Sequence, residues 1–186
     1  MITWIFIGVI VLLLLWGIAI YNRLVRLRAL VHEGFSGITV QLRRRADLIP
    51  NLVETVKGYA THERETLDAV VAHRGDAMNA GSVAATAQAD NAMTAMLGRL
   101  FAVAEAYPDL KADANFCQLQ GELSSLETEL QSARRYYNAT ARDLNTRIFS
   151  FPDMLFASPM GFKEEPYYED ADPAIQSAPK VEFQRP

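Results

Sequence analysis

The sequence predicts an all-α protein, in which a single N-terminal transmembrane helix continues into an elongated antiparallel helical bundle with an irregular C-terminal tail. Three observations lead to this fold class. The chain opens with a long uncharged apolar run, two later stretches repeat apolar residues at alternating spacings of three and four, and the last residues are rich in proline and acid. A chain of 186 residues, half of them hydrophobic, allows one compact domain with an appendage. We therefore expect a membrane anchor at residues 1–22, a helical bundle domain at residues 23–157 and a proline-rich acidic tail at residues 158–186.

The apolar run covers residues 2–21 and holds 20 residues without a charge. At a rise of about 1.5 Å per residue it reaches about 30 Å, the thickness of the hydrocarbon layer of a bilayer. It contains Trp4, Trp16 and Tyr21, residue types that membrane interfaces favour. No basic residue precedes the run and no small-residue cleavage site follows it, which favours a retained anchor over a cleaved signal peptide.

The charges beside the anchor predict its orientation. Arg23, Arg26 and Arg28 lie just after the run, so the positive-inside rule places the N-terminus outside and the helical domain in the cytoplasm. These three arginines are expected at the membrane surface, where each gains about 1 kcal/mol from anionic headgroups. The single cysteine, Cys117, fits a reducing compartment, and the net charge of −4 argues against a nucleic-acid partner.

The first bundle helix is expected to continue the membrane helix, because an apolar seam starts directly after the anchor. Arg45 falls on this seam, and a buried arginine needs a partner. The nearest carboxylate in sequence, Asp47, lies on another face of the helix, so the partner is expected from a second helix or a second chain. The seam has coiled-coil spacing and comprises Leu24, Leu27, Val31, Phe35, Ile38, Leu42, Ile49, Leu52, Val56 and Tyr59.

Three residues are expected to bend this helix before its predicted end near His73, namely Gly34, Gly37 and Pro50. Pro50 cannot donate to the carbonyl of Ala46 and crowds that oxygen, so it either kinks the helix or leaves an acceptor free. Pro50 is therefore predicted to mark where the helix bends over its partner.

Two further helices are expected after a loop at residues 75–81. Ser82 is a suitable N-cap for an alanine-rich helix that ends near residue 106, and Pro108 restarts the chain. The third helix is predicted from about residue 109 to residue 150, where Phe151 and Pro152 stop it. Its apolar seam can pack against the first helix and comprises Phe116, Leu119, Leu123, Leu126, Leu130, Ala133, Tyr137, Leu144 and Ile148.

Polar residues of the third helix have two interpretations. Three acidic side chains precede a basic group, which is common on a solvated helix face. The alternative is a buried network in which Glu127 or Glu122 neutralises Arg45 across the bundle and sets helix register or a subunit contact. The residues concerned are Glu122, Glu127 and Glu129, followed by Arg134, Arg135 and Asn138. The structural and interaction residues predicted from both helices are Arg43, Arg44, Arg45, Asp47, Pro50, Asn51, Glu122, Glu127 and Arg134.

No catalytic, cofactor-binding or metal-binding residue is predicted. His62 and Glu63 begin a zinc-protease motif, but its second histidine is replaced by Thr66. The chain has three histidines and one cysteine, and Cys117 is expected to be a small buried thiol on a helix. The tripeptide at residues 74–76, Arg-Gly-Asp, is expected to belong to a loop. Enzyme signatures such as a glycine-rich phosphate loop are absent from the sequence, which disfavours an enzyme.

Several motifs together resemble the LemA family. They are Tyr21-Asn22, QLRRRADLIPNLVETVKGYATHE at 41–63, YPDLKA at 107–112, NFCQLQGEL at 115–123, RRYYN at 134–138 and Phe151-Pro152. Two positions depart from the family pattern: Phe35 replaces a usual tryptophan, and Leu144-Asn145 replaces a second Tyr-Asn pair. The resemblance implies a bacterial membrane protein with a short outer N-terminus, one span and a cytoplasmic helical domain. It also implies relatives in magnetosome membranes and genes beside those of membrane-bound zinc peptidases, but no particular mechanism.

Two functional hypotheses follow. The first is a non-enzymatic single-span protein of the inner membrane, which contacts the lipid bilayer, forms a homo-oligomer through its helical domain and organises or remodels the membrane. Gly34, Gly37 and Gly58 are the small residues that allow close approach of identical chains. The alternative is an adaptor or accessory subunit of a membrane-bound peptidase or sensor, with the proline-rich tail as a binding segment. An enzyme that depends on His62 or Cys117 is a third, weaker interpretation.

Overall fold

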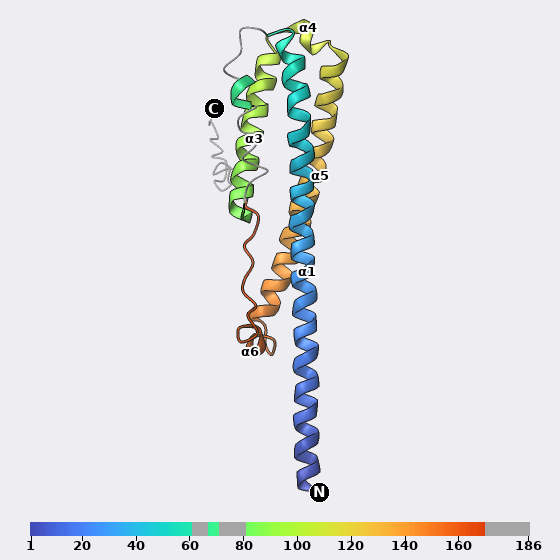
Figure 1. Cartoon of the computed structure of the whole chain (residues 1–186), viewed down its shortest axis with the longest axis vertical. Coiled ribbons are helices and arrows are strands. Elements are labelled where there is room, and N and C mark those ends of the chain that lie inside the picture. Colours follow the sequence, from blue (N-terminus) through green and yellow to red (C-terminus); the bar gives the residue numbers. More distant parts are fainter. Residues whose placement is uncertain (61–66, 71–80, 170–186) are drawn as a thin grey trace, which may run out of the picture.

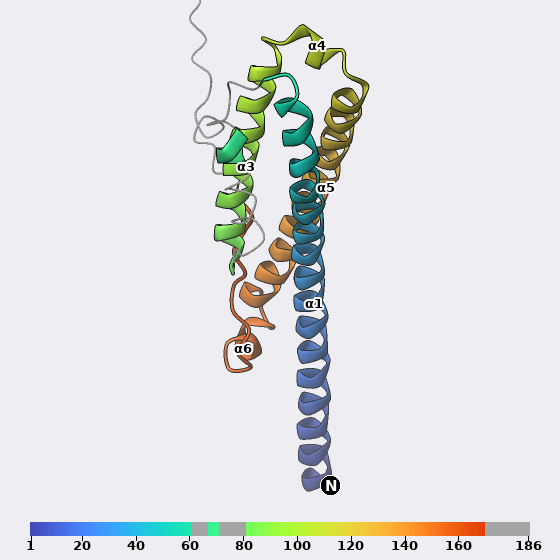
Figure 2. The ribbon, with the colours of Figure 1, turned by 45° about the horizontal axis from the view of Figure 1, so that its top comes forward.

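The computed structural model describes residues 1–60, 67–70 and 81–169 of the chain, and within these ranges the long elements are all helices. They are α1 (Ile2–Lys57), α3 (Val83–Ala104), α4 (Pro108–Lys111), α5 (Ala114–Phe149) and α6 (Met154–Ala157). The helices α1 and α5 pack antiparallel, and α3 lies beside the half of the bundle that is distal to the N-terminus (Figures 1 and 2). The all-α prediction is confirmed. The calls on His62, Glu63, Thr66, His73, the tripeptide at 74–76, the loop up to residue 80 and the tail from residue 170 lie outside the described residues.

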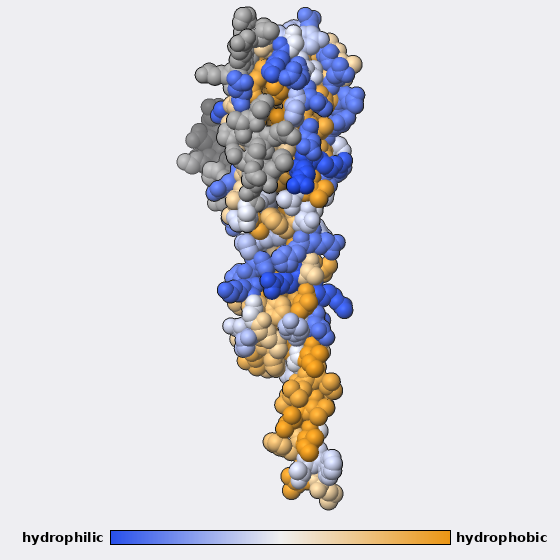
Figure 3. Space-filling model, in the orientation of Figure 1, coloured by the Kyte–Doolittle hydropathy of each residue, from blue (hydrophilic) through white to orange (hydrophobic). Residues whose placement is uncertain are grey.

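The helix α1 joins an apolar rod to the bundle without interruption. Its most apolar 18-residue window has a mean hydropathy of 2.6 and is only 6% buried, so α1 is long and apolar enough to cross a membrane. Figure 3 shows this segment as an orange rod that projects from the end of the bundle. The helix continues through Gly34, Gly37 and Pro50. Packing of Ile49 and Leu52 in the core on both sides of Pro50 maintains the helix despite the lost hydrogen bond.

The end of α1 lies earlier than the predicted position near His73. The N–H groups of Tyr59 and Ala60 both donate to the Val56 carbonyl, at 3.0 and 2.8 Å, and this tight turn ends the helix at Lys57. Tyr59 consequently leaves the seam on which it was predicted. It is exposed, and its hydroxyl donates to an Asp113 carboxylate oxygen at 3.1 Å.

Capping side chains set the starts of α3 and α5. The Ser82 hydroxyl accepts from the N–H of Ala85 at 3.2 Å, as the sequence predicts. The helix expected from residue 109 is divided into α4 and α5, because Asp113 adopts an extended conformation between them. Its carboxylate caps α5 by accepting from the N–H of Phe116 at 2.9 Å, and this hydrogen bond lowers the pKa of Asp113 below its ordinary value.

Two hydrophobic cores follow one another along the bundle. The distal core joins the end of α1 to α3, α4 and the start of α5, and its larger members include Ile49, Leu52, Met93, Leu97, Leu100, Leu110 and Phe116. The proximal core, nearer the apolar rod, joins the middle of α1 to the end of α5, and its larger members include Leu24, Ile38, Leu42, Leu130, Tyr137, Leu144, Phe162 and Tyr168. Arg45 lies between Leu42 of the proximal core and Ile49 of the distal core. The polar residues described below therefore lie between the two cores.

The first part of the expected tail packs on the bundle. After α6 the chain runs as an extended segment, residues 162–169, beside α5 toward α3 (Figure 1). We call this segment the strap. Phe162 and Tyr168 at its two ends are buried in the proximal core, so the packing continues beyond residue 157.

Candidate functional site

Four charged side chains from three helices form a closed ring of ion pairs, which we call the charge cluster. Arg45 of α1 lies 3.2 Å from an oxygen of Asp90 on α3 and 3.2 Å from an oxygen of Glu127 on α5. Arg134 of α5 pairs with the other oxygen of Asp90, and it lies 3.5 Å from the other oxygen of Glu127. Each charge therefore has two neighbours of opposite sign.

Burial of these side chains makes their mutual pairing important for the stability of the bundle. The side chains of Arg45 and Asp90 are 8% and 1% exposed, whereas Arg134 and Glu127 retain more contact with solvent. Ions removed from water lose several kcal/mol of hydration each, which is recovered only with good geometry and further hydrogen bonds. Two positive and two negative groups sum to zero, so the cluster as a whole buries no net charge.

Two hydroxyl groups add hydrogen bonds to the cluster. Arg45 also donates to the Thr94 hydroxyl at 3.1 Å, and the Tyr168 hydroxyl donates to Asp90 at 2.8 Å. The Arg134 guanidinium carbon lies 5.7 Å from the centre of the Tyr168 ring, within cation–π range. Burial and the Asp90 carboxylate raise the pKa of Tyr168 well above its ordinary value. Although burial alone lowers the pKa of Arg134, Asp90 and Glu127 outweigh it and raise that pKa.

Two asparagine side chains hold the strap on α5. The Asn138 amide donates to the Tyr168 carbonyl at 3.0 Å and accepts from the Tyr168 N–H at 2.8 Å. The Asn145 amide makes the same pair of bonds with Glu165, at 2.8 and 2.9 Å. Seven residues of helix and three residues of extended chain both span about 10 Å, so the two amides match the backbone of an antiparallel strap. Between them, the Tyr137 hydroxyl donates to the Pro166 carbonyl at 2.7 Å.

Alkaline pH is expected to destabilise this half of the bundle. Burial, followed by the Glu165 charge, raises the pKa of Tyr137 to about 12, and the pKa of Tyr168 is also raised. A phenol in an unfolded chain titrates near about 10, so the stability that these protons provide is complete below pH 10 and is lost as the pH rises through the folded-state values. Urea unfolding between pH 9 and about 12 should show stability falling by up to about 1.4 kcal/mol per pH unit for each tyrosine.

Two variants test whether Tyr137 causes this pH dependence of stability. Tyr137→Phe should flatten the fall in stability between pH 10 and 12, while Tyr136→Phe, a change at its exposed neighbour on α5, should leave the profile of the parent chain unchanged. A parent chain whose unfolding midpoint is constant from pH 9 to about 12 would contradict the assignment.

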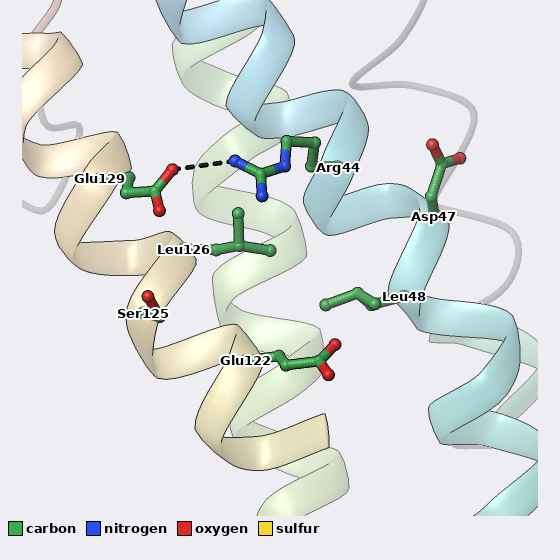
Figure 4. A pocket seen from close by; sticks show the side chains of 7 residues that line it. All are labelled: Arg44, Asp47, Leu48, Glu122, Ser125, Leu126 and Glu129. Atoms are coloured by element: carbon green, nitrogen blue, oxygen red, sulfur yellow. Dashed lines mark hydrogen bonds and ion pairs between the residues drawn. The ribbon is translucent and has the colours of Figure 1, made fainter. Parts of the chain in front are cut away.

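A surface groove lies between α1 and α5 on the flank of the charge cluster. It has a volume of about 350 Å³ and is lined by Arg44, Asp47, Leu48, Glu122, Ser125, Leu126 and Glu129. Figure 4 shows Arg44 reaching across it to Glu129, with Leu48 and Leu126 between the helices. The Arg44 to Glu129 distance is 2.9 Å, and both side chains are about half exposed, so this pair adds little stability. The groove offers exposed carboxylates and an apolar floor, which suits a polar contact more than chemistry.

The structure brings together only some of the residues singled out in the sequence. Arg45, Glu127 and Arg134 meet in the charge cluster, and Glu127 is one of the two acids considered as partners for Arg45. Glu122, the other acid, instead accepts from the Gln118 amide at 2.9 Å. The remaining residues do not join the cluster: Arg44 pairs with Glu129, Pro50 is half-buried, and Arg43, Asp47, Asn51, Arg23, Arg26 and Arg28 are exposed.

Cys117 differs from its predicted environment. It is exposed on the first turn of α5, where the preceding Phe116 takes the core position, and its thiol donates to the Lys111 carbonyl at 3.2 Å. Among residues 1–60, 67–70 and 81–169, no group of three histidine, cysteine, aspartate or glutamate side chains is placed to hold a metal ion.

Sequence reasoning missed the roles of Asp90, Tyr168 and Asn145, and it placed Asn138 among the polar residues of the third helix without its contact to the strap. Asp90 had a detectable signal, because it interrupts the apolar seam of α3, whose buried positions are Thr86, Ala87, Asp90, Met93, Leu97, Leu100 and Ala104. Asn138 and Asn145 are one heptad apart, a spacing that places both on one helix face. The role of Tyr168 had no local signal, since its partner lies 78 residues away.

A family model described as the LemA family matches residues 34–183, which include all four residues of the charge cluster and the strap. The chain belongs to the LemA family. It is 28% identical over 131 residues to "Protein LemA" of Metamycoplasma hominis, an alignment that covers 70% of this chain and 60% of that protein. It is 24% identical over 176 residues to magnetosome protein MamQ 2 of Paramagnetospirillum magneticum and to magnetosome protein MamQ of Magnetospirillum gryphiswaldense, covering 81% of this chain and 65% of each relative.

These LemA family relatives extend beyond what the chain matches, because it spans only 60 to 65% of their lengths. The N-terminal apolar helix of the chain indicates a membrane anchor, in agreement with the membrane association of LemA proteins. Among the described residues, the most densely connected polar site of this LemA family member is the charge cluster. Its charges are paired with one another across three helices, an arrangement that fixes helix positions, although Nε of Arg134 has no hydrogen-bond partner among the described residues.

Proposed function

We propose that this LemA family chain is a non-enzymatic, single-pass protein of the bacterial inner membrane, which self-associates through its helical domain and organises or remodels that membrane. The N-terminus lies outside and the bundle lies in the cytoplasm. One observation carries the proposal: α1 runs unbroken from an exposed apolar segment into the bundle core. A bundle fixed in this way moves with its anchor, so contacts between bundles act directly on the arrangement of the spans.

Three features support this proposal. The charge cluster locks α1, α3 and α5 against one another, so the bundle can act as a rigid body. Arg23, Arg26 and Arg28 are exposed directly after the apolar run, where anionic headgroups attract cations. Two relatives carry the name magnetosome protein, and magnetosomes are membrane compartments.

The three glycines expected to permit self-association differ in whether a second copy of the chain can reach them. A Cβ at Gly34 would meet α5 of the same chain, so this position belongs to the internal packing. A Cβ at Gly37 would have no heavy atom within 4 Å, so this small residue is available to a neighbouring copy. Gly58 lies at the end of α1, where it forms part of the turn.

Extraction of the full chain into native-membrane particles, followed by electron microscopy, tests the self-association. We expect particles that contain two or more copies, and we expect Gly37→Leu to reduce the number of copies while the helical content stays unchanged. Gly98→Leu on α3 is the matched control, since a Cβ there also has no heavy atom within 4 Å. Uniform monomers at physiological concentration would exclude the proposed function.

An adaptor for a membrane-bound peptidase or sensor is the second candidate. It is favoured by a groove of about 430 Å³ between α3 and the strap, whose lining includes Glu164, Glu165 and Glu169. The groove lies where the described chain ends, so a partner held there could also contact the tail. Because Tyr168 contacts the charge cluster, a deletion that tests this role should remove only residues 170–186. In the same extraction experiment, a stoichiometric second protein that is lost with this deletion would favour the adaptor.

A further inference from the structure

We infer that a second part of the chain enters the membrane beside α1. This part is residues 149–162, which comprise the end of α5, α6 and the following turn, and we call it the basal loop. The inference rests on the proposed function only in requiring that α1 spans a bilayer. Lipid of the leaflet nearer the bundle then covers the apolar surface of the basal loop.

The basal loop turns apolar side chains outward and its charge inward. Phe151 is 77% exposed and Leu155 is 59% exposed, and three further apolar side chains of the loop, Phe149, Met154 and Met160, are also exposed. Asp153 is the single charged residue between positions 148 and 162. Its carboxylate is buried and lies 3.3 Å from the Arg147 guanidinium. The outer surface of the loop is therefore apolar and uncharged, although it has no partner within the described chain.

Contacts with α1 place the loop at membrane depth. The Phe156 ring packs edge-on against Trp16, with 5.9 Å between ring centres, and it is also the nearest group to a Cβ built at Gly17. Both α1 residues lie inside the uncharged run, which continues to Tyr21 before the first charge at Arg23. Trp16 precedes Tyr21 by about 7.5 Å along the helix, which is half of one leaflet of about 15 Å.

The backbone of the loop is suited to an apolar medium, where an unpaired polar group is costly. Seven N–H groups donate to carbonyls within the loop, at distances of 2.8 to 3.1 Å. They belong to Met154, Leu155, Phe156, Ala157, Met160, Gly161 and Phe162. Seven of the twelve N–H groups of the loop are thus paired within it, which lowers the cost of placing this backbone in lipid.

Charged residues lie at the level where the basal loop ends. Phe162 packs edge-on against Tyr21, with 5.8 Å between ring centres, and Lys163 follows it. Lys163 and the exposed Arg23 thus lie at one level, where long cations reach headgroups. In Figure 3 the surface around α6 is mainly light orange, next to the orange rod and below a band of blue. This continuity with the span favours lipid over a second copy as the occupant.

Site-directed spin labelling of the full chain in nanodiscs of phosphatidylethanolamine and phosphatidylglycerol tests the inference. Cys117→Ser removes the native thiol, and single cysteines then replace Leu155, Leu12 or Ser124, all of which are exposed and whose labelling spares the cores. Oxygen concentrates in lipid and a nickel chelate stays in water. We expect the ratio of oxygen to nickel accessibility at residue 155 to be several-fold above that at residue 124 and close to that at residue 12.

The possible outcomes distinguish failure of this inference from failure of the proposed function. If the label at residue 12 reports water, α1 is not an anchor and the proposed function fails as well. If residue 12 reports lipid and residue 155 reports water, the basal loop lies outside the membrane and the inference is wrong. A label at residue 155 that is shielded from both reagents, and becomes accessible on dilution into empty lipid, would identify a second copy as the occupant and overturn it too.

Discussion

Replacement of Asp90 by alanine is expected to lower the free energy of unfolding of the bundle by about 3 to 5 kcal/mol. Asp90 is almost fully buried and accepts from Arg45, Arg134 and Tyr168. Its removal leaves two guanidinium groups that share only Glu127, so the cluster acquires one net positive charge in a poorly hydrated site. Urea unfolding of the full chain in mild detergent, followed by far-UV circular dichroism, measures the loss.

Two further variants show whether charge balance is the cause. Glu129→Ala breaks the exposed pair with Arg44 and should cost less than about 1 kcal/mol. Arg45→Met combined with Asp90→Ala leaves Arg134 and Glu127 as a neutral pair, so the double variant should be more stable than the sum of the single changes predicts, by about 1 to 3 kcal/mol. Strict additivity, or an Asp90→Ala variant as stable as Glu129→Ala, would refute the role of the cluster.

Gly34→Leu is expected to force α1 away from α5 and to cost about 3 kcal/mol. A Cβ at this position would lie 3.0 Å from the Cα of Tyr137 and 3.4 Å from the Thr140 hydroxyl. Because a backbone atom cannot rotate away, the helices must move apart, which loosens the proximal core around Tyr137. The same unfolding experiment should show a lower midpoint for this variant.

Gly121→Leu on α5, the helix that Gly34 faces, is the matched control. An added Cβ there meets no heavy atom within 4 Å, and replacing a glycine in a helix interior gains about 0.5 to 1 kcal/mol of helix propensity. The two substitutions should therefore shift stability in opposite directions. Equal shifts would show that the contact at Gly34 does not limit the approach of the helices.

The spacing of apolar residues in the sequence predicted the two long helices, because each of them buries one face. The seams of α1 and α5 are nearly those expected, and the need of Arg45 for a partner on another helix followed from the cost of an unpaired buried charge. Glu127 was one of two acids considered, and nothing in the sequence distinguished it from Glu122. The distinction depends on how far α1 and α5 slide past each other, which the packing at Gly34 helps to set.

Features decided by a few local hydrogen bonds, or by very distant partners, were not predictable. The end of α1 at Lys57 depends on a tight turn onto the Val56 carbonyl, although the apolar pattern continues past it. The strap has the composition of an extended tail, but Asn138 and Asn145 supply the hydrogen bonds that a strand would obtain from a sheet. Composition describes average solvation and carries no information on such specific partners.

If α1 spans a bilayer as proposed, its continuity converts a tilt of the span into a sideways displacement of the bundle. From Tyr21 to Lys57 the helix rises by about 54 Å. A tilt of about 20°, ordinary for a membrane helix, therefore displaces its distal end by about 18 Å. Since tilting is one way in which a helix relieves hydrophobic mismatch, a thinner bilayer would displace the bundle further from the axis of its span. In the proposed assembly, the length of α1 would thereby couple bilayer thickness to the contacts between bundles.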